Sequence, residues 1–167
     1  LRGHMVGNLL KDGSGHWSVE LGIANHRSWY QHKYGSMGIF VSDGTSAVLW
    51  LMYIGAGDAD DGTVGANYWA DRTSNVMSSS TPFLWSIRNL ASVNFLKVSY
   101  DGNYNIYTSE DGSEWRRMYS GEGYAPAFAA PFVPTQWGLG SDNCNAENLQ
   151  FAYPATLDVV HLRQAAG

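Results

Sequence analysis

The sequence predicts an all-β domain folded as a two-sheet antiparallel jelly-roll sandwich. Of its 167 residues, 14% are aromatic, 19 are glycine and only 15% are charged, against about 25% charged in ordinary globular domains. Asp-Gly pairs, which favour tight hairpin turns, separate strand-like runs at Asp101-Gly102 and Asp111-Gly112. No helix-period pattern persists for three turns. About ten expected strands exceed a minimal immunoglobulin sandwich and fit a jelly roll better.

The first half of the chain predicts three strands. Residues 17–23 alternate between apolar and small or polar side chains, which predicts a strand with one face in the core and Glu20 on the other face. The core-facing residues of this strand are Trp17, Val19, Leu21 and Ile23. Residues 24–34 lack a clear period and predict a loop, and residues 37–41 form a short apolar strand. Residues 47–54 are almost unbroken apolar, so this strand is buried on both faces or has one face under a loop or ligand.

The middle of the chain, residues 55–80, is polar and glycine-rich, and it is too long for a plain connection in a compact domain. A short strand is expected near residues 66–70. Prolines make residues 121–135 extended or loop-like. The remaining expected strands cover residues 83–87, 95–100, 104–109, 115–119, 137–140 and 156–163.

The domain organisation follows from the absence of a dividing linker. Residues 6–167 predict a single β-sandwich domain, since no stretch has the composition of an interdomain segment. Residues 1–5 resemble an expression scar ahead of a start methionine, and we excluded them from the fold prediction.

Cys144 is the single cysteine, so no intrachain disulfide can form. The lack of an intrachain disulfide is compatible with an intracellular site of synthesis.

Charge and hydropathy exclude two classes of partner. The chain carries 10 Lys and Arg against 15 Asp and Glu, a net charge of −5, and no basic cluster exceeds Arg116-Arg117. It therefore lacks the clustered positive charge that is typical of nucleic-acid-binding proteins. An anionic membrane surface is not an expected partner either. No apolar run approaches the roughly 18 residues of a spanning helix, so we expect no membrane insertion.

Several motifs occur in an order that resembles a known superfamily. They are WSVELGI (17–23), MGIFV (37–41), FLKVSYDG (95–102), S-x-DG-x-x-W (109–115), WGLG (137–140) and LDVV (157–160). This order is similar to the concanavalin A-like lectin/glucanase superfamily, in its small bacterial and phage members, over residues 17–163. The resemblance implies a jelly-roll sandwich that serves lectins, glycosidases, their binding modules and receptor-binding parts of phage tails. Turn chemistry alone also explains the motif at 109–115.

The acidic residues argue against glycoside hydrolysis. This reaction uses two carboxyl groups at one cleft, and in the glucanase branch of the superfamily the acids alternate on one strand as E-x-D-x-x-E. That motif is absent here: residues 110–114 hold three acids that straddle a turn, and Glu20 points away from the apolar face of its strand. The sequence therefore predicts that the chain is not an enzyme and has no catalytic residues.

Aromatic and amide residues in expected loops predict a sugar-binding site. A flat ring packs against the apolar face of a pyranose, while Asp, Asn and Arg side chains bind its hydroxyl groups, and Trp and Tyr are enriched at binding surfaces. The predicted ligand-binding residues are Asn67, Tyr68, Trp69, Asp71, Arg72, Trp29, Tyr30, Asp142 and Asn143, with Asn145 beside the last two. The alternative that Trp29 and Trp69 fold back to cover the ends of the sheets stays open.

Metal binding is not expected, with one alternative. The histidines are scattered without the spacing of a zinc site. Residues 57–62, Gly-Asp-Ala-Asp-Asp-Gly, have the oxygen-rich character of a calcium loop but lack the glutamate of an EF-hand. A solvated acidic turn explains this segment equally, so the prediction is no cofactor, with calcium as the alternative.

Together these observations predict a non-catalytic, lectin-like domain that binds a cell-surface glycan or polysaccharide. By resemblance, its setting is the receptor-binding end of a phage tail fibre, located in the virion, or otherwise an extracellular or cell-surface protein. Homo-oligomerisation is compatible with this setting, as a trimer in a tail fibre. The alternatives are a structural or assembly domain of a virion or surface protein, and a glycosidase or glycosidase accessory module.

Overall fold

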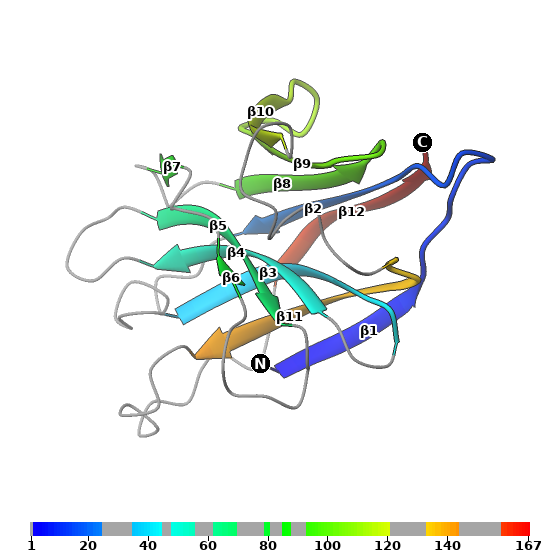
Figure 1. Cartoon of the computed structure of the whole chain (residues 1–167). Coiled ribbons are helices and arrows are strands. Elements are labelled where there is room, and N and C mark those ends of the chain that lie inside the picture. The colour runs from blue at the N-terminus through cyan, green and yellow to red at the C-terminus, as the bar shows by residue number, and fades with distance from the viewer. Residues whose placement is uncertain are drawn as a thin grey trace.

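The computed structural model describes residues 2–24, 35–44, 48–55, 62–69, 79–80, 85–87, 93–120, 133–143 and 158–167. Within these ranges all regular elements are strands, and they form two antiparallel sheets (Figure 1). The all-β, two-sheet antiparallel jelly-roll sandwich predicted from the sequence is confirmed. The described residues hold no helix with the length and apolarity needed to cross a membrane.

The larger sheet has seven strands among the described residues. Their order is β1 (Arg2–Asn8), β11 (Gln136–Asn143), β3 (Gly35–Ser42), β4 (Val48–Gly55), β5 (Gly62–Trp69) and β6 (Ser79–Ser80), and β7 (Trp85–Ile87) also pairs with β5. The smaller sheet has five described strands. Their order is β10 (Arg116–Ser120), β9 (Tyr104–Ser109), β8 (Val93–Tyr100), β2 (Trp17–Ala24) and β12 (Asp158–Ala166).

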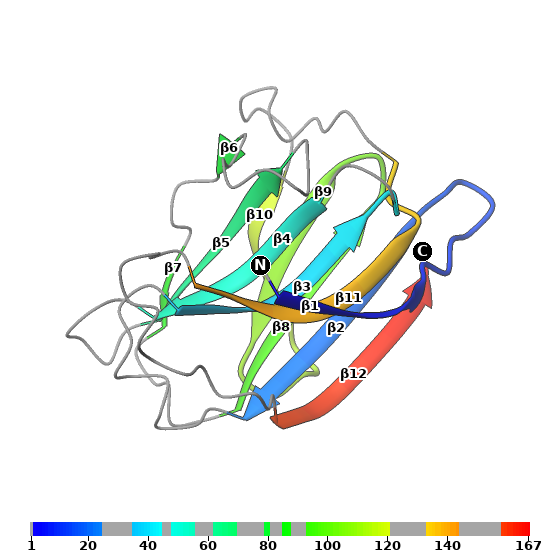
Figure 2. The ribbon, with the colours of Figure 1, turned by 90° about the horizontal axis from the view of Figure 1, so that it is seen from below.

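The core lies between the two sheets, which are stacked in Figure 2. The predicted alternation in β2 is confirmed, because the side chains of Trp17, Val19, Leu21 and Ile23 are all buried. Leu96 and Val98 continue this apolar layer in the five-stranded sheet. Ile39 and Val41 of β3 contribute fully buried side chains from the seven-stranded sheet. Burial of this layer removes apolar surface from water and is the main stabilising contribution to the fold.

Strands β8, β9 and β10 form the predicted antiparallel meander. The two Asp-Gly turns join these strands, and Gly102 and Gly112 adopt φ angles of 105° and 78°. A side chain at either position would be strained, since positive φ favours glycine. The expected strand at residues 104–109 has the observed bounds, and β8 begins two residues earlier than expected.

Three sequence-based expectations about the strands were wrong. Residues 2–5, which we had excluded from the fold, form most of β1 and pair with β11. The short strand expected near residues 66–70 begins four residues earlier, and residues 62–69 form an eight-residue strand between β4 and β6/β7. Residues 141–143 continue β11 beyond the expected end at Gly140. In each case a neighbouring strand supplies the hydrogen bonds that overcome weak local strand propensity.

Candidate functional site

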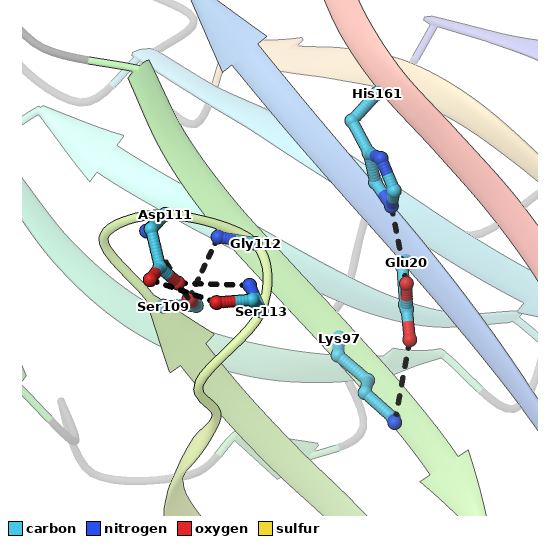
Figure 3. Close-up of polar contacts among 7 residues, drawn as sticks. All are labelled: Glu20, Lys97, Ser109, Asp111, Gly112, Ser113 and His161. Carbon is cyan, nitrogen blue, oxygen red and sulfur yellow. Dashed lines mark hydrogen bonds and ion pairs between the residues drawn. The ribbon is translucent and has the colours of Figure 1, made fainter.

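A polar cluster lies on the outer face of the five-stranded sheet, defined here as the face turned away from the seven-stranded sheet. The alternation of β2 places Glu20 on this face. Glu20 is nevertheless buried, with 6% of its surface exposed. One carboxylate oxygen lies 3.4 Å from the Lys97 Nζ, and the other lies 3.1 Å from the His161 Nε2 (Figure 3). A carboxylate held by two cationic or hydrogen-bonding groups has a fixed direction.

The partners of Glu20 come from the two strands that flank β2. Lys97 on β8 is directly opposite Glu20 in the strand register. His161 on β12 pairs with Gly22, two residues further along β2. Directly opposed residues in an antiparallel sheet project to the same face, so the register alone brings these side chains together. The cluster is therefore built on the rigid part of the fold.

Two aromatic rings border Lys97. Its ammonium nitrogen lies 5.7 Å from the centroid of the Tyr107 ring and 5.5 Å from that of the Trp115 ring. These distances are within the range of cation–π attraction, which contributes about 0.5–1 kcal/mol at exposed sites. Both residues, Tyr107 and Trp115, are half-buried.

The turn at residues 109–114 holds Trp115 beside the outer face. The Asp111 carboxylate accepts hydrogen bonds from the backbone N–H groups of Glu114 and Ser113, and from the Ser113 and Ser109 hydroxyls. These bonds, led by the one from the Glu114 backbone, hold the pKa of Asp111 far below its usual range. The S-x-DG-x-x-W motif thus acts as turn chemistry that positions an aromatic side chain.

Phe95 closes one end of the cluster. Its ring lies directly above Gly22, where an added Cβ would come within 2.7 Å of the ring, and it also contacts Gly112 of the turn. The ring meets the His161 imidazole edge-on at a centroid distance of 5.8 Å. The absence of side chains at Gly22 and Gly112 therefore allows the Phe95 ring to contact the strand and the turn together. This ring marks one end of the polar cluster on the outer face.

This arrangement is suited to binding hydroxyl-bearing ligands. The Lys97 ammonium and the His161 imidazole are partly exposed and can form hydrogen bonds to a ligand, while the Tyr107 and Trp115 rings offer flat apolar surface. Sugars present both kinds of surface. The structure places Glu20 beside two basic groups, Lys97 and His161.

The residues predicted to bind sugar are placed on the other sheet or lie outside the described residues. Asn67, Tyr68 and Trp69 end β5, and only their backbone is described. Asp142 and Asn143 end β11. Trp29, Tyr30, Asp71, Arg72 and Asn145 lie outside the described residues, as do residues 57–61 of the alternative calcium loop. Within the described part of the chain, no group of three or more His, Cys, Asp or Glu could hold a metal ion.

The strand register separates the two described groups of predicted residues. Trp69 at the end of β5 lies level with Gln136 at the start of β11. The residues between them across the sheet are Val48 of β4 and Ser42 of β3. Asn143 lies seven residue steps further along β11. At roughly 3.4 Å per residue this separation is about 24 Å. Residues 67–69 and 142–143 therefore lie at opposite ends of the seven-stranded sheet and do not form one small site.

Sequence reasoning placed Glu20 on the outward face but did not include it in the site. Lys97, Tyr107 and His161 occupy the same face of their strands, and a polar residue at every second position was the available signal. The register that opposes these strands could not be read from the sequence, because the pairing partners are far apart along the chain.

The fold is shared with solved structures of larger proteins. The GH43 protein BlXynB from Bacillus licheniformis matches with a TM-score of 0.56 and 15% identity over 91% of this chain and 28% of that chain. An engineered GH43 glycoside hydrolase with both endo-xylanase and exo-arabinofuranosidase activity matches at 0.55 and 10% identity, over 95% of this chain and 30% of that chain. The present chain spans less than a third of either. These identities show the fold alone.

A lectin is also among the similar structures. CG-16, a homodimeric agglutinin from chicken liver, has a TM-score of 0.49 and 13% identity over 98% of this chain and all of its own. At this TM-score the likeness supports no further argument. No protein-family model matches the sequence, and no curated protein matches it significantly. The two antiparallel sheets agree with the concanavalin A-like sandwich, but the likeness does not single out that superfamily.

These comparisons correct one prediction. The expectation that the chain is not an enzyme was wrong, because the structures matched at TM-scores of 0.55 to 0.57 are GH43 proteins, the family of glycoside hydrolases. The fold therefore does not separate this chain from enzymes. The comparison assigns no reaction and no catalytic residue to it, since sequence identity to these proteins is 10–15%.

Proposed function

We propose that this chain is a carbohydrate-recognition domain that binds sugar on the outer face of the five-stranded sheet. The observation that carries the proposal is the Glu20 carboxylate, which is buried on an outward face and held at both oxygens by Lys97 and His161. Two half-buried aromatic rings stand beside this polar centre. The shared fold with GH43 proteins supports a carbohydrate-related role.

Binding would use the aromatic and polar groups for different parts of the sugar. The Trp115 ring packs against the apolar C–H face of a pyranose, which removes that face from water. Hydroxyl groups at the ring edge accept hydrogen bonds from Lys97, whose ammonium group is held in place by Glu20. Because both charged groups are already fixed by their mutual contact, little side-chain ordering remains to oppose binding.

Isothermal titration with soluble glycans tests this proposal, with a panel of neutral and acidic plant, bacterial and animal polysaccharides. We expect Trp115→Ala to weaken binding about tenfold or more, the equivalent of about 1.4 kcal/mol. Trp69→Ala on the other sheet is the matched control and also tests the site predicted from the sequence. If Trp69→Ala abolishes binding and Trp115→Ala does not, the site lies at the end of β5. If no glycan binds, carbohydrate recognition is refuted.

The setting of this domain is a further part of the proposal. The chain spans under a third of the similar GH43 proteins, which favours a role as an accessory module in a larger carbohydrate-active protein. The alternative setting is the receptor-binding end of a phage tail fibre, in the virion. Binding of the labelled domain to intact bacteria, and its loss in Trp115→Ala, would distinguish receptor binding from attachment to soluble polymer.

A second candidate function, assembly, is favoured by the edges of the sheets. Among the described strands, β1 and β12 each pair on one side only, and the Gln164 amide of β12 donates to the Asn8 carbonyl of β1. Both edge strands expose apolar side chains. These are Met5, Val6, Val160 and Leu162. Exposed apolar edges favour pairing with another chain.

Light scattering after size exclusion tests whether these edges join copies of the chain. An assembly role predicts an oligomer that Val160→Lys converts to a monomer while the midpoint of unfolding changes little. A trimer would support the tail-fibre setting. A monomer at high protein concentration would refute homo-oligomerisation and leave carbohydrate recognition unaffected.

A further inference from the structure

A row of directly opposed residues crosses the five-stranded sheet on its outer face, with one residue from each strand. The register pairs Arg163 with Glu20, Glu20 with Lys97, Lys97 with Tyr107, and Tyr107 with Arg117. Since directly opposed residues share a face, all five side chains project outward from the sheet. The contacts of Glu20 with Lys97 and of Lys97 with Tyr107 agree with this placement.

The charges along this row are unevenly balanced. At its centre the Glu20 carboxylate and the Lys97 ammonium neutralise one another. The arginines at its two ends, Arg163 and Arg117, are both exposed. The row therefore carries two positive charges in excess, although the chain as a whole has a net charge of −5. Each exposed guanidinium group can bind an anionic group of a ligand directly.

The acidic turn at residues 110–114 lies to one side of the row and keeps its own negative charge. The Asp111 carboxylate is engaged by four hydrogen bonds from its own turn. Gly112 of this turn contacts Phe95, which is two residues away from Lys97 along β8. The exposed arginines stand at the outer strands β10 and β12, so the cationic groups flank the aromatic centre on both sides.

The dimensions of the row suit an extended polymer. Neighbouring strands are about 4.8 Å apart, so four strand spacings separate Arg163 from Arg117 by about 19 Å. We infer that the outer face binds a carboxylated polysaccharide, a polymer of uronic acid units, which lies across the strands with its carboxylates at Arg163 and Arg117. This inference rests on the proposed carbohydrate function and names its substrate class.

Three features of this row suit a carboxylated sugar. The guanidinium group forms two parallel hydrogen bonds with a planar carboxylate, which fixes the direction of the sugar that carries it. A uronate also keeps the apolar C–H face of its pyranose free for the Trp115 and Tyr107 rings. Two exposed arginines in a row of five residues give a low charge density, whereas highly sulfated polymers need many basic contacts.

Isothermal titration with polygalacturonate and alginate tests the inference, alongside the same polymers after chemical reduction of their carboxyl groups. We expect the reduced polymers to bind about tenfold more weakly or less. Arg117→Gln and Arg163→Gln should each weaken binding of the acidic polymer several-fold and make it less sensitive to salt. Arg116→Gln is the matched control. It removes the same charge from the adjacent residue of β10, which pairs with Thr108 and faces the other way.

Each outcome distinguishes the inference from the proposed function. If acidic and reduced polymers bind equally well and Trp115→Ala weakens both, sugar recognition stands and the preference for uronate is refuted. If dextran sulfate binds as well as the polyuronates and all three arginine variants weaken it equally, the attraction is unspecific and the inference fails. If no polymer, acidic or neutral, binds at all, the proposed function fails with it.

Discussion

The Lys97 Nζ lies 3.4 Å from a carboxylate oxygen of Glu20, across the hydrogen-bonded ladder that joins β8 to β2. The carboxylate is buried and the ammonium group is partly exposed. An ion pair of this kind differs from an exposed one, which contributes about 0–1 kcal/mol, because the carboxylate has lost most of its water. Removing this ion pair should therefore lower the free energy of unfolding.

Replacing Glu20 with glutamine removes the negative charge while it keeps the size of the side chain. We expect the free energy of unfolding to fall by about 1–2 kcal/mol, since the hydrogen bonds to charged partners are lost or weakened. Urea unfolding measures this change. A double-mutant cycle with Lys97→Met isolates the pair. Additive effects of the two substitutions would show that the two side chains do not interact.

Leu21 and Leu162 are opposed across the β2–β12 ladder, yet their side chains are exposed to very different extents. Leu21 is fully buried, whereas Leu162 is 42% exposed. We expect Leu21→Ala to lower the free energy of unfolding by about 2–5 kcal/mol, and Leu162→Ala by about 1 kcal/mol. Thermal and urea unfolding of both variants test this difference. Similar losses would contradict the open edge at β12.

Gly22 is a position where even one methyl group has no room. A Cβ there would lie 2.7 Å from the Phe95 ring and 2.9 Å from the Cβ of His161. We expect Gly22→Ala to destabilise the fold by about 1–3 kcal/mol through this overlap. Gly13→Ala is the control, because nothing lies within 4 Å of a Cβ at that position. Equal stability of the two variants would place the Phe95 ring elsewhere.

The Asp111 turn predicts a pH dependence of stability. The pKa of Asp111 is lowered in the fold, so its stabilising contribution is fully present above its unfolded pKa of about 3.9. That contribution is lost as the pH falls from there toward the lowered folded pKa. Denaturant midpoints between pH 2 and pH 7 should therefore fall less steeply below about pH 4 for Asp111→Ala than for the unmodified chain. Parallel curves would show that the turn does not depend on the charged carboxylate.

Local patterns were sufficient to predict the strands whose buried face alternates regularly. The strand from Trp17 to Ala24 is such a case, since its apolar residues occupy every second position. The first half of β5 was missed because Gly62 and Gly65 have low strand propensity. Its pairing with β4 on one side and with β7 on the other provides the hydrogen bonds that stabilise it as a strand.

The outer-face cluster could be predicted only in part. The direction of Glu20 follows from the alternation of β2, but its partner His161 is 141 residues away along the chain. A register shift of one residue would turn either side chain to the other face. The aromatic and amide residues chosen from the sequence were selected by composition, and composition does not tell which end of a sheet a residue occupies.

The pairing of β1 with β11 and of β2 with β12 joins strands from opposite ends of the chain. During synthesis on the ribosome, β1 and β2 emerge long before the strands that will cover their edges. Contacts between residues so far apart in the sequence slow folding, because the entropic cost of closing a large loop comes before the strands form their hydrogen bonds. The apolar face of β2 is thus most vulnerable to aggregation while the chain is still being translated.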